Sequence, residues 1–512
     1  MYGALFAKKG RKEVSFMLEY LKEEANRTLT ENGAVTPAST GSDCLDLFAT
    51  IGALRRESGD EIIDRFVRAY AEDRNAAMKL LFFGRDVRGG LGERRVFRVI
   101  LRWLADNEPE SVRKNIRLIA EFGRFDDLLS LLGTRCEKDA LMYLKEQFGR
   151  DLQALERGDA VSLLGKWLPS VNTSNKETVE AAGKVRRAFG LKEAEYRKAL
   201  TALRARIRIL ENDLREKDYT FDYEKQPSRA LFKYRKAFAR NDGERYAAFL
   251  DRAAKGEAVL HADNVAPYEL VEPFLKGANW FRNRSYMRSI SEEEKASLNA
   301  TWSALPDFCG EDDTLAVIDT SGSMYCTSNP LPASVALSLG LYMAERNKGA
   351  FRGHFIEFSA HPRLIGIKGE TFADRLRYAA SFNEVANTDL EAVFDLILDA
   401  AVKNRVPQDE LPARLVIISD MEFDSCIQNA ELSNFENAKR KFEAAGYRLP
   451  EVVFWNAASR HRQQPVTLNE QGVALVSGVT PRLFGMIAGG VLSPYTFMME
   501  VLESERYAAV TA

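Results

Sequence analysis

The sequence predicts a multidomain protein in which a helical region precedes an α/β domain with a mostly parallel sheet. The chain has 512 residues, which is too long for one ordinary hydrophobic core. From residue 43 to about residue 275 the pattern of apolar residues is helical throughout. From residue 314 onward, short apolar runs rich in β-branched residues alternate with helical segments, as in α/β domains. We therefore expect an N-terminal extension over 1–40, a helical domain over 41–300 and an α/β domain over 301–512.

The N-terminal extension and the helical domain differ in pattern. Within the extension, residues 13–29 are compatible with one helix, and residues 31–43 collect Asn, Gly, Pro, Ser and Thr, which is typical of a loop. The helical domain consists of amphipathic segments of roughly 10 to 18 residues, separated by Gly, Asp, Asn and Pro. Examples are 61–71, 94–106, 111–121 and 137–148. Helices of this length favour antiparallel pairs stacked side by side, as in a HEAT-like α-solenoid or ring.

Three parts of the helical domain are rich in arginine and lysine: residues 82–103, 184–210 and 225–240. The last of these contains no acid and interleaves Phe232, Tyr234 and Phe238 with the bases. Arginine binds phosphate bidentately, and aromatic rings can stack on unpaired bases. The alternative is that these segments are ordinary solvated helix faces with aromatic core positions. The glycines near residue 90 lack the pattern of a phosphate-binding loop, so we expect a tight turn between helices there.

The α/β domain is predicted from alternating strands and helices. The expected strands are 314–319, 351–358, 414–420, 451–456 and 473–477, and the expected helices are 331–347, 371–380, 389–403, 430–445 and 494–506. In sheets of this kind, ligands bind beyond the carboxyl ends of the parallel strands.

A candidate metal site follows from that rule. The stretch TLAVIDTSGSM, residues 314–324, runs from an apolar strand into a turn in which Asp319, Ser321 and Ser323 present oxygen at alternate positions. Asp420 ends a second strand, and Thr388 precedes a helix, so both face the same edge. Carboxylates and hydroxyls are hard ligands that suit Mg²⁺ or Mn²⁺. The alternative is a metal-free domain in which these residues cap helices.

This constellation resembles the metal-ion-dependent adhesion site (MIDAS) of a von Willebrand factor A domain, a doubly wound α/β fold. The resemblance implies that Ser321, Ser323 and Thr388 bind the ion through hydroxyls, and that Asp319 and Asp420 hold it directly or through water. One position would stay open for an acidic group of a partner. Asp389 is expected to cap its helix instead. No histidine lies in these three loops, so no nucleophile and general base pair is expected, and the predicted protein is not an enzyme.

The two halves together resemble the TROVE proteins of the Ro autoantigen type, and more closely a related uncharacterised family that couples the same modules. The segments that carry this resemblance are RDVRGGLGERRVFR, FGRFDDLL, KWLPS, YRKALTALRARIRILE and DTSGSM. The resemblance implies a ribonucleoprotein that takes single-stranded RNA ends into a helical ring and small structured RNA on its outer surface. The candidate RNA-binding residues are Arg85, Arg88, Arg94, Arg95, Lys166, Arg204 and Arg235.

Composition limits the function classes further. The net charge is −2, so any nucleic-acid site must be a local patch. The five cysteines are scattered and form no CxxC pair, which argues for a reducing compartment, and no run of apolar residues is long enough to span a bilayer. We expect a cytoplasmic, non-catalytic RNA-binding scaffold. The alternative is a metal-dependent protein-adhesion module that captures an acidic partner. A phosphodiester-cleaving metalloenzyme is disfavoured because a single ion would lack a general base.

Overall fold

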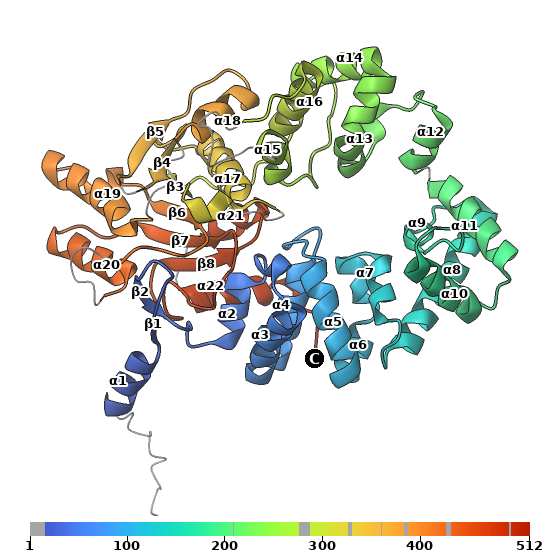
Figure 1. The fold of residues 1–512 in the computed structure, drawn as a ribbon, viewed down its shortest axis with the longest axis horizontal. Helices are drawn as coiled ribbons and strands as arrows, with labels where there is room; N and C mark the ends of the chain where they lie inside the picture. The colour runs from blue at the N-terminus through green and yellow to red at the C-terminus, as the bar shows by residue number, and fades with distance from the viewer. Residues whose placement is uncertain are drawn as a thin grey trace, which may run out of the picture.

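The computed structural model describes residues 16–207, 209–275, 287–325, 330–359, 361–382, 388–425, 432–490 and 493–512. Within these ranges the chain forms a small N-terminal hairpin, an arc of helices and an α/β domain with a six-stranded sheet (Figure 1). The helical region precedes the α/β domain, as the sequence predicts. No helix in these ranges is both long and apolar enough to cross a membrane.

The N-terminal segment is a helix followed by an antiparallel hairpin. Helix α1 covers Phe16–Ala25, and strands β1 (Arg27–Leu29) and β2 (Val35–Pro37) pair with each other. The predicted helix over 13–29 therefore ends early, and its residues 13–15 lie outside the described ranges. Residues 27–29 form a strand because their backbone groups find partners across the turn, which a local helical pattern does not reveal.

Helices make up most of the described chain between residues 43 and 303. Their bounds are α2 (Asp43–Thr50), α3 (Gly59–Glu72), α4 (Arg74–Arg85), α5 (Arg95–Asn107), α6 (Pro109–Asn115), α7 (Leu118–Phe122), α8 (Glu137–Arg157), α9 (Leu164–Trp167), α10 (Lys176–Phe189), α11 (Glu193–Ile207), α12 (Leu210–Glu216), α13 (Ser228–Asn241), α14 (Gly243–Ala254), α15 (Pro267–Leu275) and α16 (Glu292–Ser303), with 3₁₀ helices η1 (Leu54–Arg56), η2 (Phe125–Leu131) and η3 (Tyr223–Lys225) between them.

Local sequence explains where several of these helices begin and which face they bury. In α5, the buried residues recur at helical spacing: Val96, Phe97, Ile100, Leu101 and Leu104. Helix α3 begins after Ser58, whose side chain accepts a hydrogen bond from the backbone of Glu61. The helix predicted over 111–121 is divided into α6 and α7, and the one predicted over 137–148 continues to the end of α8.

The α/β domain is built on a sheet with strand order β5-β4-β3-β6-β7-β8. Its strands are β3 (Thr314–Asp319), β4 (His354–Phe358), β5 (Arg363–Gly366), β6 (Arg414–Ser419), β7 (Glu451–Asn456) and β8 (Val473–Ser477). Its helices are α17 (Pro332–Arg346), α18 (Phe372–Ala380), α19 (Leu390–Asn404), α20 (Asn434–Ala444), α21 (Arg482–Ile487) and α22 (Pro494–Leu502), with 3₁₀ helices η4 (Gly322–Tyr325), η5 (Gln408–Glu410) and η6 (Glu505–Tyr507).

Most of these elements agree with the sequence prediction. The strands predicted at 314–319, 414–420, 451–456 and 473–477 are confirmed to within one residue, and they run parallel. The strand predicted over 351–358 begins at His354, and residues 430–431 of the helix predicted over 430–445 lie outside the described ranges. Strand β5 was not predicted; it pairs antiparallel with β4 at the sheet edge, where its short, half-exposed sequence carries no clear alternation.

Both faces of the sheet are covered by helices, which explains why the central strands are apolar at successive positions. One face carries Leu315, Val317, Leu415, Ile417 and Phe454, which pack with residues of α19 and α20. The opposite face carries Ala316, Ile318, Val416, Ile418 and Trp455, which pack with residues of α17 and α21. That second cluster continues into the core of the helical region, so the two parts share one hydrophobic core.

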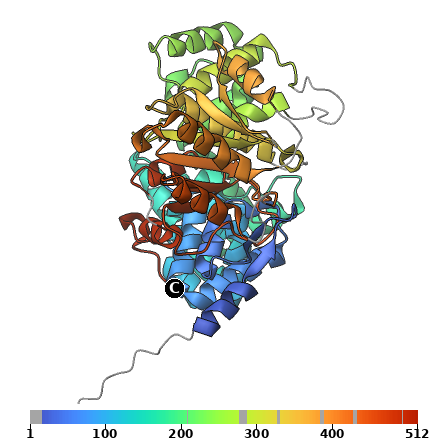
Figure 2. The ribbon, with the colours of Figure 1, turned by 90° about the vertical axis from the view of Figure 1, so that its left-hand side faces the viewer.

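Both ends of the helical arc contact the α/β domain (Figures 1 and 2). At one end α2 packs on β8, and a Cβ atom at Gly52 would lie only 2.4 Å from the Ser477 carbonyl oxygen, so this approach requires glycine. At the other end α15 packs on α17 and α16 packs on α18. The C-terminal segment strengthens the contact at the first end, because Arg506 and Tyr507 both donate hydrogen bonds to the carboxylate of Asp86. Figure 2 shows the α/β domain between the first helices, in blue, and the later helices, in green.

Candidate functional site

The predicted metal-binding carboxylates lie at the ends of two adjacent parallel strands, β3 and β6. Asp319, the last residue of β3, accepts hydrogen bonds from the backbone N–H of Ser321 at 2.8 Å and from the Ser419 hydroxyl at 2.6 Å. The hydroxyl oxygens of Ser321 and Ser323 are 3.0 Å apart. Asp420 follows β6 directly. The parallel pairing of β3 with β6 thus brings both carboxylates and both serine hydroxyls to one sheet edge.

Both carboxyl groups are buried, and the charge of Asp420 disfavours the ionised form of Asp319. Asp319 has no exposed surface, and Asp420 is 3% exposed. Burial raises the pKa of Asp319 and the neighbouring Asp420 raises it further, while burial also raises the pKa of Asp420. One guanidinium nitrogen of Arg460 lies 3.4 Å from the Asp420 carboxylate and offsets part of the charge. Two buried carboxylates beside two hydroxyls are a donor set that fits a hard divalent cation such as Mg²⁺ or Mn²⁺.

Thr388 reaches the same edge by a different route. Its hydroxyl donates to the backbone carbonyl of Glu422 at 2.7 Å and accepts from the side-chain amide of Asn32 at 3.0 Å. The Thr388 hydroxyl proton therefore points to the Glu422 carbonyl, two residues after Asp420. An ion would bind a lone pair of the Thr388 hydroxyl oxygen. Asp389 accepts a hydrogen bond from the backbone N–H of Ala392, which confirms the expected helix cap on α19.

The N-terminal hairpin, for which the sequence suggested no role, covers this edge. Asn32 donates to the Glu422 carbonyl as well as to Thr388, and the Thr30 hydroxyl donates to the Phe423 carbonyl. The backbone N–H of Glu31 donates to the Glu422 carboxylate at 2.7 Å. These partners are separated by more than 300 residues in the chain, so no local pattern announces the contact.

A fourth loop, after β7, also reaches the site. His461 hydrogen-bonds the Glu31 carboxylate at 2.8 Å and lies 4.0 Å from that of Glu422, and Arg460 pairs with Glu31 at 2.6 Å. The hydrogen bond from His461 is the main cause that lowers the pKa of Glu31. No histidine occurs in the three loops that carry the predicted metal ligands, but the tertiary structure places His461 beside them. We call Asp319, Asp420, Glu422 and Glu31 the acidic cluster.

Two of the candidate RNA-binding arginines hold the helices together. Arg85 is 1% exposed, and its guanidinium pairs with the buried carboxylate of Asp127 at 2.8 Å. Arg204 donates from all three guanidinium nitrogens, to the carbonyls of Gly165 and Leu168 and to the Ser170 hydroxyl. Internal partners therefore engage both guanidinium groups, which gives Arg85 and Arg204 a role in holding the helices together. RNA binding by these two residues stays a prediction.

The other four candidates apart from Arg88 lie nearer the surface. Arg94 pairs with Asp126 at 2.5 Å, Arg95 donates to the carbonyls of Arg55 and Glu57, and the Lys166 ammonium lies 5.8 Å from the centre of the Trp167 ring.

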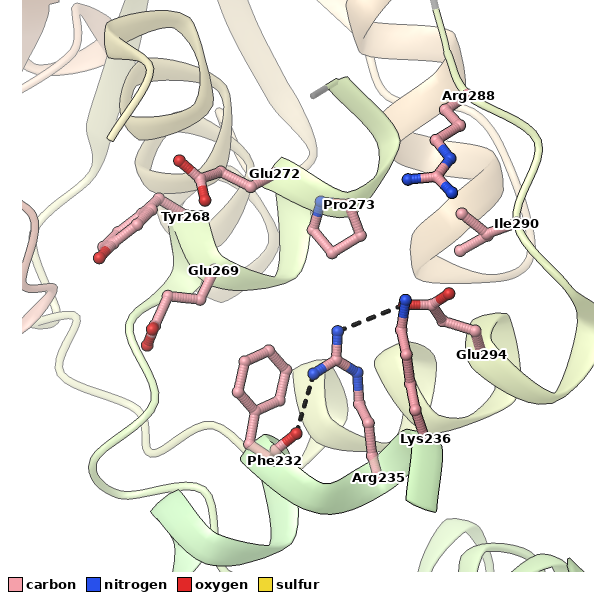
Figure 3. Close-up of a pocket in the computed structure, with 10 residues that line it drawn as sticks. All are labelled: Phe232, Arg235, Lys236, Tyr268, Glu269, Glu272, Pro273, Arg288, Ile290 and Glu294. Atoms are coloured by element: carbon pink, nitrogen blue, oxygen red, sulfur yellow. Dashed lines mark hydrogen bonds and ion pairs between the residues drawn. The ribbon is translucent and has the colours of Figure 1, made fainter. Parts of the chain in front are cut away.

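Arg235 projects into a pocket of about 340 Å³ between α13 and α15, where it hydrogen-bonds the Phe232 carbonyl and pairs with Glu294 (Figure 3). Lys236 pairs with the same glutamate at 3.0 Å. The lining carries three basic and three acidic residues: Arg235, Lys236, Arg288, Glu269, Glu272 and Glu294. This balance of charge gives no preference for an anion.

Arg88 opens onto a more basic cavity at the junction of the two parts of the protein. The cavity measures about 430 Å³, and residues near the start of the helical region, residues of the α13–α15 segment and the loop after β8 all line it. Its lining includes five arginines and two carboxylates: Arg55, Arg88, Arg124, Arg229, Arg482, Asp263 and Glu269. We call it the arginine cavity.

The arginines of this cavity fall into two groups. Arg55 pairs with Glu93, and Arg229 pairs with Glu269. Arg88, Arg124 and Arg482 have no carboxylate within ion-pair distance among the residues that the structure describes. Arg88 donates to the Glu121 carbonyl, Arg482 donates to the Asp263 carbonyl, and Arg124 lies over the Trp167 ring at 4.6 Å. Burial is the main cause that lowers the pKa of Arg124, and the nearby Arg85 adds to it, whereas Asp126 and Asp127 act in the opposite direction.

Sequence reasoning found Arg88 but not the rest of the arginine cavity. Arg482 follows the end of β8, so the position rule for parallel sheets could have drawn attention to it. Arg55 and Arg124 stand in helical segments with ordinary charge, and only the closing of the arc places them here.

Comparison with known proteins gives matches over nearly the whole chain. Residues 313–493 match a family described as Domain of unknown function (DUF7788). The uncharacterized protein L728 of Acanthamoeba polyphaga mimivirus is 28% identical over 521 aligned residues, which cover 94% of this chain and 88% of that protein. The crystal structure of the Deinococcus radiodurans RO (RSR) protein aligns over 90% of this chain and 93% of its own, with 12% identity and a TM-score of 0.42, which is too low to carry a conclusion.

The helical part gives the most extensive family match. Residues 30–150 and 141–308 match the model described as Domain of unknown function (DUF2828), and together these matches span more than half of the 512 residues. The chain therefore belongs to the family described as Domain of unknown function (DUF2828).

Proposed function

We propose that this protein is a non-catalytic RNA-binding scaffold, in which the arginine cavity binds the phosphodiester backbone and the acidic cluster around Asp319 holds a divalent cation. The observation that carries the proposal is the set of three arginines, Arg88, Arg124 and Arg482, that face one cavity without carboxylate partners. The sequence resemblance to Ro-type proteins, with a HEAT-like ring and a von Willebrand factor A domain, agrees with it.

The electrostatics of the arginine cavity favour an anion with several oxygens. Five guanidinium groups face two carboxylates, so the lining carries excess positive charge. A phosphate group accepts two parallel hydrogen bonds from one guanidinium, and successive phosphates can engage successive arginines. Tyr268 and Phe308 also line the cavity and could stack on unpaired bases, and the Arg482 guanidinium already lies 5.2 Å from the centre of the Phe308 ring. A single strand with splayed bases, including the end of a small structured RNA, fits this lining better than a rigid duplex.

The acidic cluster lies at the same end of the sheet as the loop that leads from β8 to Arg482, the first residue of α21. Strand β8 is separated from β6 by β7 alone, and all three run parallel, so Asp420 and the 478–481 loop leave the sheet on the same side. When bound, Mg²⁺ or Mn²⁺ would supply an electrophilic position for a phosphate or carboxylate oxygen. Asp319 and Asp420 would hold the ion, Ser321, Ser323 and Thr388 would orient their hydroxyls toward it, and Asn32 fixes the Thr388 side chain.

The scaffold function includes no chemical step on RNA. The Nε2 atom of His461 is hydrogen-bonded to the Glu31 carboxylate at 2.8 Å, so this imidazole nitrogen contacts the N-terminal hairpin. A cytoplasmic location and binding of small RNAs are parts of the same proposal. RNA that remains intact after long incubation with the protein and Mg²⁺ is the expected result, and turnover that disappears in Asp420→Ala would contradict it.

The binding proposal is tested by fluorescence anisotropy of a labelled single-stranded RNA at low salt. The triple variant R88Q/R124Q/R482Q should bind about 100-fold more weakly and lose part of its salt dependence, because each lost contact removes a released counterion. The matched control R187Q/R197Q/R240Q removes three exposed arginines from the basic helical segments outside the cavity and should bind within about twofold of the wild type. Absence of RNA affinity in the wild type, or equal losses in both triple variants, would refute the proposal.

A further inference from the structure

A groove of about 1190 Å³ lies between α14, α16 and the start of α18, away from the arginine cavity and the acidic cluster. Its lining is unusually poor in large side chains and includes Ala239, Ala247, Ala253, Ala254, Ala258, Ala296, Ala300 and Ala304. Leu250 and Phe372 add apolar surface, and Val259 is 57% exposed at its edge. Short side chains on both helices leave room between them that the protein does not fill itself.

The rim of this groove is acidic. Its charged residues are Glu244, Asp251, Glu292, Glu293, Glu370 and Arg375. Arg375 is already paired with Glu345 at 2.7 Å, so it does not offset the acids. Asp251 and Glu292 pair with lysines of their own helices, Lys255 and Lys295. Glu244, Glu293 and Glu370 form no ion pair with any basic side chain in the described part of the chain. An RNA backbone would be repelled here, and a cation is favoured.

The size and shape of the groove fit a helix. Its volume corresponds to about two to three turns of a helix with a diameter near 10 Å, and it exceeds what most small-molecule pockets need. Alanines allow the axis of an incoming helix to approach closely. Apolar side chains of such a helix would contact the alanine floor and Val259, and its lysines or arginines would reach the three unpaired glutamates.

We propose that this groove binds a basic amphipathic helix of a protein partner. The partner would contact both parts of the chain, because α14 and α16 belong to the helical region whereas Thr371 and Phe372 belong to the α/β domain. The carbonyl oxygen of the Asn299 side chain accepts a hydrogen bond from the backbone of Ala373 at 3.0 Å, so this junction is held in place before a partner arrives. Peptide binding in this groove requires neither RNA binding nor an ion in the acidic cluster.

The test uses a fluorescent helical peptide of leucine, alanine and lysine, with the lysines on one face. The full-length protein should bind it at low salt, and should bind neither a shuffled peptide of the same composition nor a version with glutamate in place of lysine. The variant E244Q/E293Q/E370Q should bind about tenfold more weakly, because three complementary charges are lost. The matched control E177Q/E180Q/E193Q removes three exposed glutamates of α10 and α11 that form no ion pair with the residues the structure describes, and it should bind like the wild type.

A second variant tests the shape of the groove independently of charge. The pair A247W/A296W fills the groove from α14 and α16 at positions that are exposed, and should abolish peptide binding while circular dichroism and the melting temperature stay unchanged. Equal binding of the shuffled peptide, or unchanged binding by both groove variants, would overturn the proposal. It would also be overturned if RNA binding, rather than peptide binding, responded to A247W/A296W, because the groove would then be a nucleic-acid site.

Discussion

The acidic cluster and the arginine cavity are assembled in different ways. Asp319 and Asp420 end two strands that pair directly, so the topology of a parallel sheet is enough to bring them together. The arginine cavity needs Arg55 and Arg124 from the first helices, Arg229 from the middle of the chain and Arg482 from the α/β domain. It exists only because both ends of the helical arc meet that domain.

The basic helical segments differ from the arginine cavity and the acidic cluster in how many of their charged side chains pair within the protein. The basic helical segments attract attention through their abundance of arginine, yet Arg85, Arg94 and Arg204 are engaged by the protein itself. Among the described residues, Arg88, Arg124 and Arg482 have carbonyl or aromatic partners but no ion pair. In the acidic cluster, Arg460 lies near Asp420 but also pairs with Glu31. Charge without an internal counterpart, rather than abundance of charge, therefore marks the regions that favour a ligand.

The largest expected effect is the difference in unfolding free energy between a variant of a buried, ion-paired arginine and a variant of an arginine of the cavity. Replacing Arg85 with alanine should destabilise the protein by about 3–5 kcal/mol, because it leaves the buried Asp127 with Arg98 alone as its cationic partner. Arg88, three residues later and exposed, should cost less than about 0.5 kcal/mol when changed to alanine. Urea unfolding of the two variants measures the difference. Equal losses would mean that the cavity arginines also hold the fold.

An intermediate effect tests the acidic cluster. Mg²⁺ or Mn²⁺ at about 100 times its Kd should stabilise the wild type by about 2.7 kcal/mol through mass action, and Asp319→Asn should remove this increment. Thermal unfolding in the presence of the ion and of EDTA gives the measurement. The control Asp389→Asn keeps a helix cap on α19 and should retain the increment. An ion-dependent increment that survives in Asp319→Asn would show that the cation binds elsewhere.

The smallest effect concerns the hairpin that completes the acidic cluster. Asn32→Ala removes hydrogen bonds to the Thr388 hydroxyl and to the Glu422 carbonyl, and should cost about 1–2 kcal/mol. It should also weaken Mn²⁺ binding, because Thr388 loses a partner that fixes its orientation; a Mn²⁺ titration checks this. As a control, Asn404→Ala removes an exposed asparagine whose side chain bonds only within its own helix, and should leave Mn²⁺ affinity unchanged. Identical Mn²⁺ affinities for Asn32→Ala and the wild type would contradict a role for the hairpin.

The sequence predicted the sheet well because its central strands are covered on both faces and are therefore apolar at successive positions, as in the run from Thr314 to Ile318. Strand β5 escaped prediction because it is short and lies at the edge. The strand formed by residues 27–29 escaped because its pairing partner, not its own composition, decides its conformation.

The sequence by itself determined the order of the two parts and the position of Asp319, Ser321, Ser323 and Asp420 at one edge of a sheet, because strand ends and parallel pairing follow from local apolar patterns. Only the tertiary structure decided that Asn32, Arg460 and His461 lie at that end of the sheet. It also decided which arginines pair with other residues inside the helical region. Those contacts join residues that are far apart in the chain, and such contacts depend on how whole elements pack rather than on any local spacing of residue types.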